Sequence, residues 1–144
     1  MAYVDAQTLL SDAQALTATA VSTNYINLGA AQTYLGTGEP MAVLITVDVA
    51  AGGTSPTLIA TLQSDDNTSF SSAATVAVSP TFAGATLVAG YQFILPIPVG
   101  TATEQYIRLS YTVGGTTPTV TVTAIVKPTS MVGQQHYLPN AYTV

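Results

Sequence analysis

Apolar and polar side chains alternate along several segments of this chain, with the period of two that is typical of a strand buried on one face. Residues 106–113 alternate Ile, Leu, Tyr and Val with Tyr, Arg, Ser and Thr. Residues 119–127 alternate valine or alanine with threonine over most of their length. Both segments predict half-buried antiparallel strands.

A third strand is predicted for residues 41–49, which are rich in β-branched side chains. Its inward face is expected to consist of Val43, Ile45, Val47 and Val49. Thr46 and Asp48 lie on the opposite face, although Leu44 interrupts the polar character of that face. The segment therefore predicts a strand with an imperfectly polar outer side.

Clusters of turn-forming residues separate these segments. The cluster at 52–56 has the sequence Gly-Gly-Thr-Ser-Pro and precedes a further apolar alternation at 57–63. We therefore expect 57–63 to form a hairpin with 41–49. A closely similar cluster, Gly-Gly-Thr-Thr-Pro at 114–118, precedes the strand predicted at 119–127.

Weaker strand signals occur at 25–28, 74–79 and 91–97. Pro96 and Pro98 have no amide hydrogen to donate, so the last of these strands should end at a sheet edge or a bulge. Together the segments predict six to eight strands. The expected fold is an all-β antiparallel β-sandwich of jelly-roll type.

The predicted organisation is an N-terminal arm at 1–22, a β-sandwich domain at 23–127 and a C-terminal tail at 128–144. The tripeptide Asp-Ala-Gln occurs at 5–7 and again at 12–14, two helical turns later. The two copies would share one face of a helix. An irregular arm lying along the sandwich is the alternative.

Charged side chains make up only 6% of the 144 residues, and 48% are hydrophobic. Either hydroxyl and amide side chains cover the surface, or part of an apolar surface is covered by other subunits, and the second interpretation is favoured. With a net charge of −5 and only Arg108 and Lys127 as strong bases, neither nucleic acid nor an anionic membrane is an expected partner. The chain shows no secretory signal pattern and no apolar run long enough to span a membrane.

Candidate chemistry is sparse. The chain has no cysteine, and its single histidine, His136, stands apart from any nucleophile motif. Asp65-Asp66-Asn67 reads as a polar turn, and whether it binds a cation is left open. We therefore expect that the protein is not an enzyme, that it has no catalytic, metal-binding or cofactor-binding residue, and that it uses no cofactor.

Contacts with other protein are the more plausible role for the remaining unusual residues. Arg108 stands on the polar face of a strand and is expected to pair with an acidic side chain, whereas the large apolar side chains of the arm and tail are expected to dock on protein. The interface candidates are Leu9, Leu10, Arg108, Met131, Tyr137, Leu138 and Tyr142.

Four segments, at 5–29, 35–49, 62–76 and 87–113, resemble the small capsid cement, or decoration, proteins of short-tailed bacteriophages. The resemblance implies a jelly-roll-like homotrimer on the outer surface of the virion capsid, where it would bridge subunits of the major capsid protein and stabilise the shell. Because charges are few, we expect this attachment to withstand high salt.

A carbohydrate-binding or receptor-binding sandwich of a phage particle is the main alternative. Tyrosine-rich, uncharged surfaces also suit sugars, and the chain has eight tyrosines although it has no tryptophan.

Overall fold

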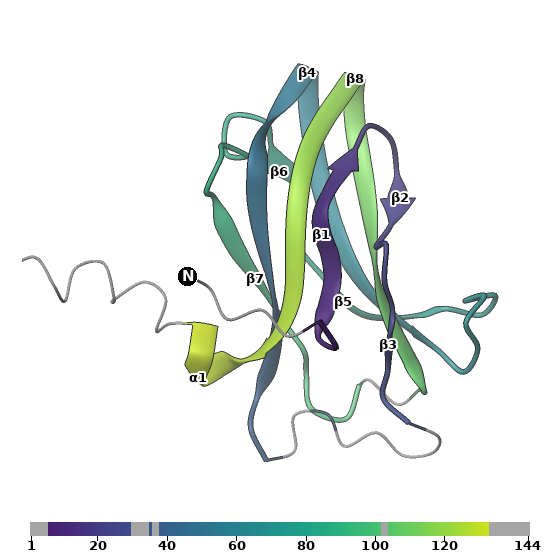
Figure 1. Ribbon diagram of the computed structural model, residues 1–144. Coiled ribbons are helices and arrows are strands. Elements are labelled where there is room, and N and C mark those ends of the chain that lie inside the picture. Colours follow the sequence, from purple (N-terminus) through teal and green to yellow (C-terminus); the bar gives the residue numbers. More distant parts are fainter. Residues whose placement is uncertain (1–5, 30–34, 36–37, 102–103, 133–144) are drawn as a thin grey trace, which may run out of the picture.

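Two long antiparallel strands run the full height of the molecule (Figure 1). The computed structural model describes residues 6–29, 35, 38–101 and 104–132. The elements in this part of the chain are β1 (Leu9–Leu16), β2 (Ala20–Val21), β3 (Ile26–Asn27), β4 (Met41–Asp65), β5 (Ala74–Val78), β6 (Phe82–Ala83), β7 (Gln92–Pro96), β8 (Tyr106–Pro128) and the short helix α1 (Thr129–Val132).

The two long strands, β4 and β8, pair with each other from Met41 opposite Pro128 to Asp65 opposite Tyr106. In one half of this pair, β7 lies beside β4 and β1 lies beside β8, which gives the order β1-β8-β4-β7 and is called layer I. In the other half, β5 and β6 lie beside β4 while β2 and β3 lie beside β8, which is called layer II.

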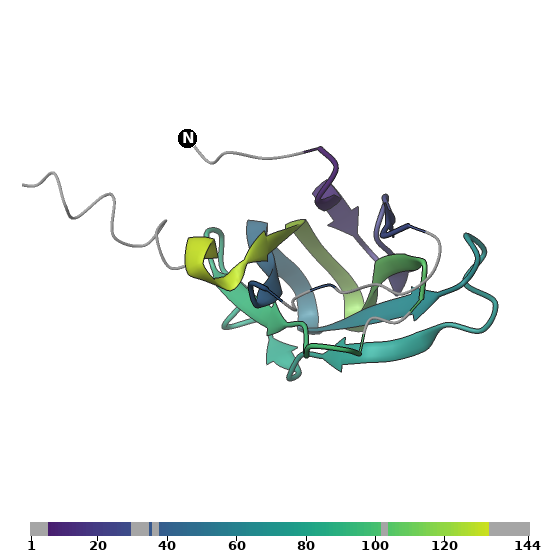
Figure 2. The same cartoon turned by 90° about the horizontal axis from the view of Figure 1, so that it is seen from below.

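A single hydrogen-bonded sheet of eight strands thus folds into two antiparallel layers. Seen from below, β1 in purple lies above the long strands, and β5 and β6 in teal lie below them (Figure 2). The strand order within the layers is that of a jelly roll. The predicted all-β sandwich is confirmed.

The long strands bend where two glycine-containing clusters face each other. Residues 52–56 of β4 pair with residues 114–118 of β8 through several register shifts, the mark of β-bulges. The hairpin predicted between 41–49 and 57–63 is therefore wrong. Both segments belong to the single strand β4, because the two clusters bulge together and carry the pair from one layer into the other without reversing the chain.

The hydrophobic core lies between the layers and draws on both halves of the long strands. The predicted inward faces at 107–111 and 120–126 are confirmed, as are Val43, Ile45 and Val47. Val49 is 58% exposed, so its predicted inward position is wrong. The register shifts that flank Val49 in the β4–β8 ladder reverse its direction relative to the preceding residues.

The N-terminal segment forms the edge strand β1 instead of the helix or irregular arm that the repeat left open. It pairs with β8, with register shifts around Ser11 that interrupt the regular alternation. Leu10 and Leu16 are both buried in the core between the layers. Long-range pairing and the burial of these leucines override the helical spacing of the repeat.

Strand β7 is the outer strand of layer I and pairs with β4. Its last residue, Pro96, stands opposite Ala42, and Pro98 follows just beyond it. The predicted edge position of this proline-containing segment is confirmed.

Candidate functional site

The outward face of layer I carries an apolar row that crosses all four strands. Leu9 stands opposite Ile125, Ile125 opposite Leu44, and Leu44 opposite Ile94. These four side chains are called the outer row. Leu44 and Ile125 are only 4% and 6% exposed although they face away from the core, because Val132 of α1 packs on them. The interruption of polarity at Leu44 therefore marks the place where α1 docks.

The outer row remains open at one end. Ile94 is 46% exposed, and Met131 on α1 is 53% exposed. The neighbouring polar side chains satisfy one another, since Thr123 Oγ1 donates a hydrogen bond of 2.6 Å to Asp48 Oδ2 and Gln92 Nε2 donates one of 3.1 Å to Thr46 Oγ1. This face thus offers apolar area more than free polar groups.

The outward face of layer II carries an aromatic cluster built around Arg108. Its members are Arg108, Gln63, Phe70, Tyr25 and Tyr106, and together they are called the Arg108 cluster. Gln63 stands opposite Arg108 in the ladder, and its Oε1 accepts a hydrogen bond of 3.0 Å from Arg108 Nε. The Cζ atom of Arg108 lies 4.2 Å from the centroid of the Phe70 ring. Tyr25 packs edge-on against both Phe70 and Tyr106.

The loop that follows β4 is organised by the carboxylate of Asp65, which is 1% exposed. Oδ1 accepts hydrogen bonds from the amide and the side chain of Asn67, and Oδ2 accepts one of 2.8 Å from the amide of Ser72. Burial raises the pKa of this carboxyl, but the hydrogen bonds from Ser72 and Asn67 outweigh the effect of burial, so that the pKa lies below its ordinary value.

These contacts bear on whether Asp65-Asp66-Asn67 binds a cation, because they occupy the carboxylate oxygens of Asp65. The Asp65 oxygens already bind donors of their own loop. Within the described residues there is no group of three or more histidine, cysteine or acidic side chains that could hold a metal ion. The loop is built to hold its own backbone and to place Phe70.

A buried polar chain links β1 to β8. The hydroxyl of Tyr111 lies 2.8 Å from Ser11 Oγ, which donates a hydrogen bond of 2.8 Å to Gln14 Oε1. The same Oε1 accepts a hydrogen bond from the amide of Thr23, and Gln14 Nε2 donates a hydrogen bond to the carbonyl of Val21. Burial raises the pKa of Tyr111 far above its ordinary value. These hydrogen bonds are structural, because they hold β1 and the end of β2 against the core.

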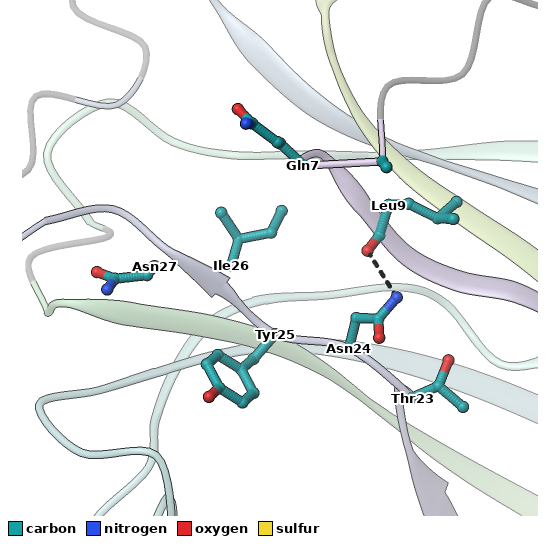
Figure 3. Close-up of a pocket in the computed structure, with 8 residues that line it drawn as sticks. Gln7, Leu9, Thr23, Asn24, Tyr25, Ile26 and Asn27 are labelled. Carbon is teal, nitrogen blue, oxygen red and sulfur yellow. Dashed lines mark hydrogen bonds between the residues drawn. The ribbon is translucent and has the colours of Figure 1, made fainter.

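A shallow hollow lies beside the start of β1 and β3, with Leu9 and Ile26 at its apolar side (Figure 3). Its lining also includes Thr23, Asn24 and Asn27, and the side chain of Asn24 donates a hydrogen bond of 3.3 Å to the carbonyl of Leu9. The hollow holds about 560 Å³ and is open to solvent. The lining thus combines amide and hydroxyl groups with one aromatic residue, Tyr25. Sugar-binding sites in proteins use groups of these kinds.

The interface candidates fall into different environments. Leu9 is half-buried in the outer row and Met131 is exposed on α1, whereas Leu10 is buried in the core and so cannot contact a partner. Arg108 is held by an amide and an aromatic ring instead of the acidic side chain expected for it. Outside the described residues lie Tyr137, Leu138, Tyr142 and His136.

Two surface features were missed in the sequence. The outer row could have been found from Leu44 together with the uninterrupted apolar run Ala124-Ile125-Val126, because both break the alternation on the outward face of a strand. Phe70 gave no comparable signal, since it lies in a polar loop and its contact with Arg108 depends on how that loop folds back.

The fold is that of an antiparallel jelly-roll protein. One outward face carries the outer row, the other carries the Arg108 cluster, and charged side chains are few. The chain belongs to the Bbp16 family, which it matches over residues 10–126 and therefore over most of its length. Among curated proteins, none matches this chain. In the described part of the chain, no helix is long and apolar enough to cross a membrane.

Proposed function

We propose that this protein is a structural virion protein, a capsid cement protein that binds the outside of a phage head and stabilises contacts between major capsid protein subunits. The resemblance of four segments to cement proteins of short-tailed phages supports this. The proposal includes no catalytic step, no cofactor, and neither nucleic acid nor membrane as a partner.

The observation that carries the proposal is the outer row. Apolar side chains cross the whole outward face of layer I, and Ile94 and Met131 leave that row partly exposed in a single chain. Exposed apolar area bordered by satisfied polar groups is a feature of protein contact surfaces. We assign this face to contacts between copies of the chain, with a homotrimer as the assembly.

Assembly matters for a protein that holds a shell together. Each subunit of a trimer brings its own contact to the head, and linked contacts raise the overall affinity through effective concentration without requiring any one of them to be strong. A trimer placed over a junction between capsid subunits therefore resists their separation.

The test uses heads that lack this protein. Purified protein is mixed with such heads, the heads are sedimented, and the bound protein is measured, with heads of an unrelated phage as the control. We expect saturable binding to the matching heads, increased resistance of those heads to heat, and retention of the bound protein at about 1 M NaCl, where the screening length falls to about 3 Å. Absence of binding, or release by salt alone, would contradict the proposal.

The hollow of Figure 3 favours one second candidate, a carbohydrate-binding or receptor-binding module of a phage particle. Its amide and hydroxyl lining beside Tyr25 could accept a sugar ring. A glycan array separates the two functions. Specific glycan binding that is lost on substitution of Asn24 by alanine, without binding to heads, favours the second.

A further inference from the structure

We propose that Arg108 binds the partner of this protein, and that its guanidinium group forms an ion pair with a side-chain carboxylate of that partner protein. This inference rests on the proposed function, because the partner surface is taken to be the phage head. It assigns layer II to the head, while the outer row of layer I serves contacts between copies.

The side chain of Arg108 is held in place before any partner arrives. Its Nε donates to Gln63 Oε1 at 3.0 Å, and its guanidinium carbon lies 4.2 Å from the centre of the Phe70 ring. The hydrogen bond fixes the plane of the group and the ring supports one of its faces. A side chain that is ordered in the free protein loses little conformational freedom on binding.

The support under the guanidinium is itself held by the fold. Phe70 is 7% exposed and has a φ of +52°, a left-handed conformation that a phenylalanine rarely adopts. Hydrogen bonds from Asn67 and Ser72 to the buried Asp65 carboxylate close the loop that carries it. Backbone strain of this kind persists only where surrounding contacts impose it, and it concentrates at functional positions.

The outer edge of the guanidinium has no partner in the described residues. Its Nε is occupied by Gln63, but its two terminal nitrogens make no hydrogen bond in that part of the chain. Those nitrogens carry four N–H donors in the planar arrangement that binds a carboxylate through two parallel hydrogen bonds. The arrangement offers a ready receptor for one aspartate or glutamate.

The surroundings favour a protein carboxylate over other anions. The chain carries a net charge of −5 and Arg108 is its only arginine, so a polyanion such as nucleic acid would be repelled by the rest of the molecule. Tyr25, which is 50% exposed, and the half-buried Tyr106 belong to the Arg108 cluster and can exclude water from a docked ion pair. Arginine and tyrosine are, with tryptophan, enriched among the residues that contribute most to binding at protein interfaces.

The test compares three variants in the head-binding assay. Arg108→Gln removes both the positive charge and the planar set of N–H donors. Arg108→Lys keeps the charge but loses the planar set of donors. Lys127→Gln is the matched control, because it makes the same change in net charge on layer I. Thermal unfolding and solution mass are measured for each variant, so that a folding or assembly defect is recognised independently.

We expect Arg108→Gln to weaken binding to heads by about tenfold or more, as is typical when a central interfacial arginine is lost. Arg108→Lys should also weaken binding by several-fold, since lysine cannot form the two parallel hydrogen bonds. Lys127→Gln should bind within about twofold of the wild type, because the half-buried Lys127 stands opposite Ala42 in layer I, outside the proposed contact with the head.

The two proposals fail in different ways. If the wild-type protein does not bind heads, the proposed function fails. If the wild-type protein binds and Arg108→Gln or Arg108→Lys binds equally well, the docking role of Arg108 is refuted while the proposed function stands. Equal weakening of binding by Lys127→Gln would show an effect of net charge alone and would also refute the role of Arg108. Specific binding of an acidic sugar that requires Arg108 would refute it as well.

Discussion

Gly53 and Gly115 each lie against the backbone of the strand that carries the other. A Cβ atom on Gly53 would come within 2.7 Å of the carbonyl oxygen of Thr116, and one on Gly115 would come within 2.8 Å of those of Thr54 and Ser55. Both glycines have positive φ, at +97° and +108°. The bend between the two layers therefore depends on the absence of a side chain at two matched positions.

This contact predicts that Gly53→Ala destabilises the fold by about 2 kcal/mol or more, because the new methyl group clashes with the opposite backbone and the positive φ is unfavourable for alanine. Gly90→Ala is the control, since Gly90 has a φ of +84° but nothing within 4 Å of an added Cβ. Gly90→Ala should lower the free energy of unfolding by about 1 kcal/mol, which is the cost of the positive φ alone. Chemical denaturation measures both, and equal losses would contradict the importance of the close approach.

The outer row predicts that Ile94→Gln weakens the self-association of the chain while leaving the fold nearly as stable. Ile94 is 46% exposed in the single chain, so its substitution removes more from a contact between copies than from the core. Solution mass across a concentration series measures the effect. Val78→Gln is the matched control, because Val78 is 55% exposed but lies on layer II. Self-association that is unchanged in Ile94→Gln would argue against the outer row as the contact.

The buried pair of Tyr111 and Ser11 predicts an energetic coupling. Ser11→Ala should destabilise by about 1–3 kcal/mol, since it leaves the buried Tyr111 hydroxyl without the partner at 2.8 Å. Adding Tyr111→Phe removes that orphaned hydroxyl, so the double variant should lose clearly less than the sum of the two single losses. Denaturation of the four proteins gives the cycle, and additive losses would show that the hydroxyls do not interact. Tyr106→Phe, which alters a half-buried tyrosine, serves as a reference.

The hydrogen bonds to Asp65 predict a loss of stability in acid. The folded protein holds the pKa of this carboxyl below its unfolded value, so the contribution is complete above about pH 4 and is lost as the pH falls through the lower folded pKa. Asp65→Asn should be less stable at neutral pH and should lose less further stability in acid. Asp12→Asn, at an exposed position of β1, is the matched control for the removal of one carboxylate. Thermal unfolding between pH 2 and 7 compares them, and parallel profiles for Asp65→Asn and wild type would contradict this role.

Local alternation was sufficient to predict the strands whose neighbours are regular. Ile107, Leu109 and Tyr111 point inward as expected, because an unbroken ladder keeps the period of two. Val49 points outward because the ladder shifts register on either side of it. Register shifts arise from how two distant clusters fit together, and the sequence around Val49 does not contain that information.

Glycine and proline clusters were the main source of error. Residues 52–56 have the composition of a hairpin turn, but they pair with a nearly identical cluster 62 positions later and bend without turning back. The near-repetition of the motif was the available signal, since two matching clusters in two β-rich segments suit a pair of strands that bulge together. The Arg108 cluster could not be predicted in the same way, because Phe70 reaches it through the fold of a polar loop.

The continuity of β4 and β8 has a mechanical consequence. In a sandwich of separate strands, the two layers are joined by side-chain packing and by loops at the ends. Here two adjacent strands, paired with each other on both sides of their bulged middle, pass through both layers. A force applied to one face of the molecule is therefore carried to the other face along covalent backbone, and the layers cannot slide apart unless that ladder is torn open.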